Sequence, residues 1–297
     1  MTATASPQTE TLHSDAMGLD LRADSEVLSQ LLNSQQMALK SMSSALPEIA
    51  AAAELLVKSI RNGGRLHYAA AGSSALMGLA DGAELPGTFG LTADRIAIHM
   101  AGGVPLNGNM PGHTEDNDSA ALAAAETVKP QDVVIAISAS GSTPYPMAFA
   151  QAARDHDAAI IGIANNADAP LFALADVAIH LKTPPEVIAG STRLGAATAQ
   201  KVALNMMSTL TGIRLGHVFD GMMVNLVADN EKLRGRAIGI VTQITGTTEM
   251  TAQDCLQKAN GAVKPAVLLA AGAASIQQAN TIIEQANGDL RVALRQL

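Results

Sequence analysis

Short apolar runs alternate with helix-like stretches through the middle of this chain, and that alternation limits the possible fold more than any other feature. In the helix-like stretches apolar residues recur at steps of three and four residues, whereas the short runs are almost wholly apolar. The expected strands are 66–71, 95–100, 133–138, 159–164 and 177–181. Strands that alternate with helices are joined by right-handed crossovers. The sequence therefore predicts an α/β fold in which helices flank a parallel sheet.

Helices are expected before, between and after these strands. Besides a short segment at 170–175, the expected helices are 24–45, 47–62, 75–85, 119–128, 146–154, 192–213 and 230–244. Within 248–297 the pattern predicts three short helical segments, broken at Gly261, near Ala274 and at Gly288. The sheet should thus be followed by a region that contains helices and no strands.

Three parts are predicted along the chain. Residues 1–23 show no periodicity and should form an extended arm, 24–245 should form the main domain, and 246–297 a small helical C-terminal domain. At 297 residues, 48% of them hydrophobic, the chain can bury a large core. Aromatic residues make up 2% and Trp is absent, so the core must be built from aliphatic side chains and Met. This composition favours an α/β or helical fold over an all-β sandwich.

Charge and cysteine content narrow the possible partners. The formal net charge is −8 and no basic stripe is present, which argues against nucleic acid as a partner. No apolar stretch reaches the roughly 20 residues that a bilayer requires, so no membrane contact is expected. Cys255 is the single cysteine, and residues 1–17 lack the apolar core of a signal peptide. A cytoplasmic location is therefore expected.

Hydroxyl-rich turns follow two of the expected strands. Gly72-Ser73-Ser74 follows the first strand, and Ser138-Ala-Ser140-Gly141-Ser142-Thr143 follows the third, each at the start of a helix. A helix N-terminus offers unpaired N–H groups and a positive dipole end, so hydroxyls placed there suit a phosphate. A third hydroxyl pair stands at 191–192, at the start of the long helix that carries Lys201, which faces either the anion or solvent. The residues expected to bind phosphate are Ser73, Ser74, Ser138, Ser140, Gly141, Ser142, Thr143, Ser191 and Lys201.

Several short blocks, in order along the chain, resemble a known family. They are Asp81–Gly90, Ala101–Gly103, Glu115-Asp116, Ser140–Tyr145, Gly190–Leu194, Thr198–Lys201 and Asn205–Thr209. From about residue 47 to the C-terminus the sequence is similar to the N-acetylmuramic acid 6-phosphate etherases of the sugar isomerase (SIS) superfamily. The resemblance implies an SIS-type parallel sheet flanked by helices, with a small C-terminal helical bundle.

The resemblance also implies an activity. These etherases are lyases that remove the D-lactyl ether from C3 of N-acetylmuramic acid 6-phosphate, giving N-acetylglucosamine 6-phosphate and D-lactate. Glu84 and Glu115 stand where the family has its catalytic acids. Glu115 is expected to act as the base at C2 and Glu84 as the acid that serves the lactate oxygen. No metal or organic cofactor is required, and a homodimer is expected because superfamily members often complete their sites across a dimer.

The chain also departs from the family pattern. Arginines that the family carries after the first strand and within Ser-Gly-Arg-Thr-Pro are replaced by Leu76 and Ser142, and a Lys is replaced by Gly195. Of the N-terminal Thr-Glu-x-Arg-Asn signature, Thr9-Glu10 alone is present. Loss of three cations near an anionic substrate leaves two alternatives open. One is a non-catalytic sugar-phosphate sensor that acts through a partner, and the other is an aldose–ketose isomerase of the same superfamily.

Overall fold

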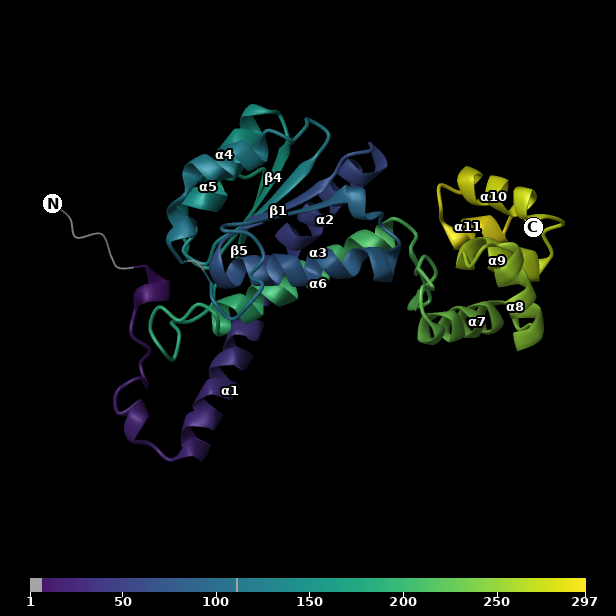
Figure 1. Cartoon of the computed structure of the whole chain (residues 1–297). Helices are drawn as coiled ribbons and strands as arrows, with labels where there is room; N and C mark the ends of the chain where they lie inside the picture. The colour runs from purple at the N-terminus through teal and green to yellow at the C-terminus, as the bar shows by residue number, and fades with distance from the viewer. Residues whose placement is uncertain (1–6, 111) are drawn as a thin grey trace. The chain divides into compact units, whose positions relative to one another are not determined.

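Five parallel strands form one sheet in the order β2-β1-β3-β4-β5 (Figure 1). The computed structural model describes residues 7–110 and 112–297. The strands are β1 (Leu66–Ala70), β2 (Ile96–Met100), β3 (Val133–Ile137), β4 (Ala159–Ala164) and β5 (Val177–His180). Each predicted strand is present within one residue at either end. The predicted α/β fold with a parallel sheet is confirmed.

Helices cover both faces of this sheet (Figure 1). One face packs on α4 (Asp118–Ala125) and α5 (Pro144–Asp155), which together with the sheet bury Phe149, Ala150 and Val134 completely. The other face carries α2 (Leu46–Arg61), α3 (Gly72–Phe89) and the first part of α6 (Gly195–Arg214). Three short 3-10 helices, Ala93–Arg95, Gly112–Asp116 and Pro170–Leu174, lie in the connections.

Helix α3 runs close to the sheet because two glycines face it. A β carbon on Gly78 or Gly82 would lie 3.5 Å and 3.1 Å from side-chain atoms of Tyr68. The Tyr68 hydroxyl donates to Asp81 Oδ2 at 2.8 Å. Asp81 Oδ1 accepts from Asn205 and Ser208 on α6, both at 2.9 Å. These buried bonds fix α3 between β1 and α6, which in turn fixes the N-terminus of α3 at the edge of the sheet.

The N-terminal region begins with the described part of the predicted arm. It contains short 3-10 helices at Gln8–Glu10 and Leu19–Leu21, and the first six residues of the arm lie outside the described residues. Helix α1 (Asp24–Lys40) follows, and Figure 1 shows it extending away from the sheet. The helix predicted at 24–45 is α-helical to Lys40 and continues as a 3-10 helix, Ser41–Ala45.

The described residues divide into two compact units. The first contains the arm, the sheet and residues up to Gly82 and from Asp94 to Ser208, and the second contains Ala83–Ala93 and Thr209–Leu297. The second unit holds a short hairpin, β6 (Val218–Phe219) with β7 (Met222–Met223), and five helices, α7 (Glu231–Thr245), α8 (Glu249–Lys258), α9 (Val263–Ala271), α10 (Ile276–Gln285) and α11 (Leu290–Leu294).

The helices of the second unit enclose their own core, which includes Val241, Ala266 and Val267. The breaks predicted at Gly261 and Gly288 are present, and both glycines adopt a positive φ. Four helices rather than three follow α7, because a last one forms after Gly288. In the described part of the chain no single helix is long and apolar enough to span a membrane, although the bent pair α9 and α10 meets that criterion by length and composition.

Candidate functional site

The direction of the connections reverses between β1 and β3, and this reversal locates the site. The chain passes from β1 to β2 on one side and then returns to β3 on the other side of β1. In parallel sheets ligands bind at the carboxyl ends of the strands at such a switch point. The last residues of the two strands, Ala70 and Ile137, are paired neighbours. The two serine turns that follow them therefore lie next to each other.

The turn after β3 gathers four hydroxyls around one point. Ser138 Oγ lies 2.8 Å from Thr143 Oγ1 and 3.2 Å from Ser140 Oγ. Ser142 donates from its hydroxyl to Ser140 Oγ at 3.2 Å. The Gly141 amide donates to Ser138 Oγ at 3.0 Å. Helix α5 begins directly after these residues, so hydroxyls and a helix N-terminus converge as a phosphate requires.

Gly141 is required at its position for two reasons. Its φ is +73°, a conformation that residues with a side chain rarely adopt. A β carbon there would also lie 2.2 Å from Ala169 Cβ. The serine loop is therefore held closely against the segment that follows β4.

The turn after β1 brings Glu115 to the start of α3. Gly72 begins that helix with a φ of +53°, Ser73 is half-buried and Ser74 is buried. Glu115 Oε1 lies 2.7 Å from the position that a β carbon on Gly72 would occupy. Burial raises the pKa of the Glu115 carboxyl, and the charge of Asp116 adds to that rise. Glu115 is thus a carboxylate with increased proton affinity beside a predicted phosphate turn.

Glu84 lies elsewhere on α3. It stands twelve residues after Gly72, which corresponds to about 18 Å along the axis of an α-helix, and its side chain is exposed. The structure therefore does not bring Glu84 to the serine turn at the start of the same helix.

The third hydroxyl pair lies before α6 and not at its first turn. The helix expected from residue 192 begins at Gly195. Its first amides are already bound, because Glu186 accepts from Gly195 N at 2.9 Å and from Ala196 N at 2.8 Å. Ser191 and Thr192 are half-buried, and Lys201 is exposed. Phosphate binding by Ser191 and Lys201 stays a prediction.

Three residues in and around the site were missed by the sequence analysis. Asn165 and Asn166 follow β4, and Asn166 joins the arm to the serine loop. The available signal was a pair of amide side chains directly after an expected strand. Glu186 was also missed as a cap, since its partners lie nine and ten residues away.

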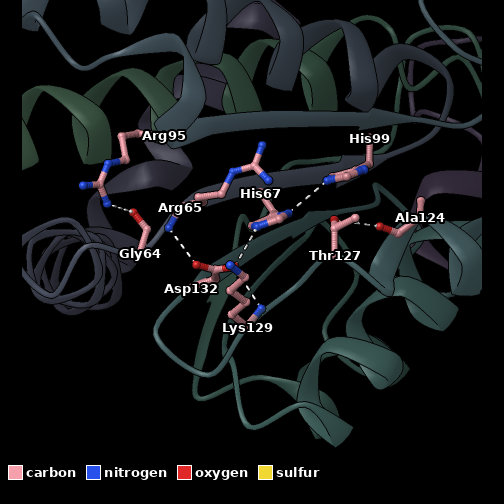
Figure 2. Close-up of polar contacts among 9 residues, drawn as sticks. All are labelled: Gly64, Arg65, His67, Arg95, His99, Ala124, Thr127, Lys129 and Asp132. Atoms are coloured by element: carbon pink, nitrogen blue, oxygen red, sulfur yellow. Dashed lines mark hydrogen bonds and ion pairs between the residues drawn. The ribbon is translucent and has the colours of Figure 1, made fainter.

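A chain of polar side chains, buried at His67 and Asp132 and half-buried at His99, crosses the α4/α5 face of the sheet (Figure 2). His67 Nε2 lies 3.1 Å from Asp132 Oδ2, and His67 Nδ1 lies 3.0 Å from His99 Nε2. Because Asp132 can only accept, neutral His67 donates to it and accepts from His99. Burial lowers the pKa of His67, and it lowers that of His99 to about 4. In the described residues no cluster of His, Cys, Asp and Glu is arranged to hold a metal ion.

Comparison with known proteins places this chain in a family. A model of the SIS domain matches residues 30–165. The N-acetylmuramic acid 6-phosphate etherase of Deinococcus radiodurans is 37% identical over 289 residues, covering 97% of this chain and 95% of that protein. The etherase of Mycolicibacterium smegmatis is 38% identical over 289 residues, covering 97% of each. That of Symbiobacterium thermophilum is 44% identical over 224 residues, covering 75% of each.

A solved structure supports the fold. A Bacteroides fragilis protein, named as a phosphosugar isomerase involved in capsule formation, superposes with a TM-score of 0.51 at 20% identity, covering 67% of this chain and 95% of that one. Likeness at this identity concerns the fold alone, which is the SIS sheet seen here. The full-length similarity to the etherases goes further, and by it this chain belongs to the N-acetylmuramic acid 6-phosphate etherase family.

Proposed function

We propose that this protein is an enzyme that cleaves the D-lactyl ether of N-acetylmuramic acid 6-phosphate, or of a close amino-sugar phosphate, to N-acetylglucosamine 6-phosphate and D-lactate. The observation that carries the proposal is family membership over nearly the whole chain, with 37% identity to a named etherase across 97% of its residues. The hydroxyl loop and Glu115 support it, because the loop follows β3 while Glu115 lies against Gly72, which follows the neighbouring strand β1.

The phosphate is assigned to the loop of Ser138, Ser140, Ser142 and Thr143. Their hydroxyls bond to one another, and each carries an O–H donor that can rotate toward a phosphate oxygen. The N-termini of α3 and α5 add N–H groups and a favourable dipole. Neutral donors thus supply the binding that the missing family arginines would otherwise share.

Glu115 is assigned as the base. In the open-chain sugar the C1 aldehyde acidifies the C2 proton, and the Glu115 carboxylate removes it. The C3–O bond then breaks, and lactate leaves as its oxygen is protonated. Water adds to the unsaturated aldehyde, with hydroxyl at C3 and a proton at C2, and this gives N-acetylglucosamine 6-phosphate. The raised pKa of Glu115 makes its carboxylate a stronger base than an ordinary glutamate.

Glu84 is assigned as the acid that protonates the lactate oxygen. Because it lies three turns from the start of its own α3, we assign this role to Glu84 in a homodimer in which a second copy brings it to the site.

Helix α1 supports a second copy, since Leu28, Leu32 and Leu39 are 65%, 59% and 40% exposed. Its first turn is acidic and its last turn contains Lys40, so two antiparallel copies would pair opposite charges. A cytoplasmic location is part of the proposal.

An assay for D-lactate tests the function. Incubation with N-acetylmuramic acid 6-phosphate should release D-lactate, and Glu115→Gln should abolish the release while sugar phosphate still binds. Asp116→Asn, at the exposed neighbouring carboxylate, is the matched control and should retain release. A ketose product from other sugar phosphates would indicate the isomerase alternative. Saturable binding without lactate or ketose would indicate the sensor.

A further inference from the structure

The N-terminal arm is bonded to the carboxyl edge of the sheet at several points. Gln8 donates from Nε2 to the Thr183 carbonyl, after β5, at 2.9 Å. The Gly190 amide, in the segment before α6, donates to the Thr9 carbonyl at 3.1 Å. Thr9 is only 6% exposed, although it belongs to an otherwise exposed stretch. The arm is therefore docked through Thr9, close to the loops that follow the strands.

Asn166 connects this arm to the phosphate loop with one side chain. Its Oδ1 accepts from the Thr9 amide at 3.3 Å. Its Nδ2 donates to Thr9 Oγ1 at 3.3 Å and to the Ser140 carbonyl at 3.2 Å. All the polar atoms of the amide group are used, and Asn166 is 8% exposed. Loss of either partner would therefore leave buried polar atoms without a hydrogen bond.

Asn165, the residue before Asn166, bonds to the core and not to the arm, and it holds the end of β4 in place. Asn165 is 1% exposed and donates to Thr183 Oγ1 at 3.1 Å, while its Oδ1 accepts from Gln200 on α6 at 2.9 Å. Its backbone amide donates to the Ala139 carbonyl in the serine loop at 3.0 Å. The end of β4 is thus fixed to the core, so a bond from Asn166 can hold Ser140 in place.

We propose that Thr9 and Asn166 are positioning residues for sugar-phosphate binding, and that docking of the arm is coupled to occupation of the Ser138–Thr143 loop. Ser140 is the residue through which the coupling runs, because its carbonyl bonds Asn166 and its hydroxyl lies among those of Ser138, Ser142 and Thr143. The proposal rests on the proposed function for the identity of the sugar phosphate.

Coupling of this kind is reciprocal. If a docked arm favours the conformation of the loop that binds phosphate, bound phosphate must favour the docked arm by the same factor. The Thr9 and Gly190 amides report docking directly, because each is bonded across the contact between arm and loops. Their hydrogen exchange should slow when ligand binds.

The first test measures binding and turnover in four variants of the full chain. Asn166→Ala and Thr9→Ala should raise KM for N-acetylmuramic acid 6-phosphate, and Kd for N-acetylglucosamine 6-phosphate and inorganic phosphate, by about tenfold with little change in kcat. Thr9→Ser keeps the hydroxyl and should restore wild-type values. Thr11→Ala is the matched control, because its hydroxyl bonds the Pro7 carbonyl within the arm.

The second test follows hydrogen exchange at Thr9 and Gly190 with and without N-acetylglucosamine 6-phosphate. Ligand should slow exchange in the wild type but have no such effect in Asn166→Ala. The coupling would be overturned if KM and Kd were unchanged in both alanine variants. It would also be overturned if ligand did not change the rate of hydrogen exchange at Thr9 and Gly190 in the wild type. A fall in kcat at constant KM would indicate a merely structural role and would also overturn it. A wild-type chain that binds phosphate without releasing lactate would overturn the proposed function and leave the coupling in place.

Discussion

The carboxylate of Glu115 lies against the backbone of Gly72, with Oε1 2.7 Å from the position that a β carbon on that glycine would occupy. This contact links the 3-10 helix Gly112–Asp116 to the first turn of α3. A side chain at residue 72 would therefore push the Glu115 carboxylate out of this place. The position of the proposed base therefore depends on a glycine in another element.

Replacement of Gly72 by Ala should displace Glu115. The new methyl group would collide with Oε1, and the φ of +53° would be strained for alanine, at a cost of about 1 kcal/mol or more in the free energy of unfolding. Lactate release should fall by much more than this loss of stability accounts for. A D-lactate assay and a melting curve of the same variant would show the difference. Gly87→Ala on the same helix has open space around its β carbon and should leave lactate release unchanged. Full activity in Gly72→Ala would contradict the assigned position of the base.

The pH dependence of turnover should reflect the surroundings of Glu115. Burial and the neighbouring Asp116 raise its pKa, so the acidic limb of kcat/KM should lie above the pH expected for an ordinary carboxylate. Asp116→Asn removes one cause of the rise, and the limb should move to lower pH. Glu115→Asp provides a comparison that keeps the charge but shortens the side chain. A limb that does not move in Asp116→Asn would mean that another group controls it.

The buried histidines should make the fold sensitive to acid. The folded-state pKa of His99 is lowered from 6.5 to about 4, so the unfolded chain binds a proton first as the pH falls. Stability is therefore retained above pH 6.5 and lost between pH 6.5 and 4, by up to about 3 kcal/mol for a shift of this size. Melting curves across this range should show the loss, and His99→Leu should reduce its slope. Exposed His156→Gln is the control, and an equal slope in wild type and His99→Leu would refute the assignment.

The local sequence pattern was enough to predict the strands of the sheet, but it could not predict the long-range contacts that shape the site. Buried strands such as β3 are continuous apolar runs, so β3 could be read from Val133 to Ile137 without knowledge of its neighbours. The start of α6 could not be predicted in this way, because Glu186 caps the helix from outside and its first turn begins at Gly195. The bond between Thr9 and Asn166 joins residues 157 positions apart, and nothing local signals it. The family blocks name Glu84 as a site residue, but they do not show how a residue three turns from the start of α3 reaches the site.

Restoring a family arginine should strengthen substrate binding. Ser142 stands where the family carries Arg, and it is exposed at the start of α5, so a longer side chain meets no buried neighbour. Ser142→Arg should lower KM for N-acetylmuramic acid 6-phosphate by about tenfold or more, since a charge-assisted hydrogen bond contributes roughly 1.5–3 kcal/mol. The value of kcat should stay the same because Glu115 is untouched. Added salt should reduce the gain, as it screens the new charge.

Ser142→Gln separates charge from size in this experiment, because it adds a long polar side chain without a positive charge. It should leave KM near the wild-type value. If Ser142→Arg also leaves KM unchanged, residue 142 does not face the phosphate, and the loop binds through Ser138, Ser140 and Thr143 without it. If Ser142→Arg lowers the Ki of inorganic phosphate as an inhibitor by the same factor as it lowers KM for the sugar phosphate, the arginine acts on the phosphoryl group itself. That result would place residue 142 at the phosphate.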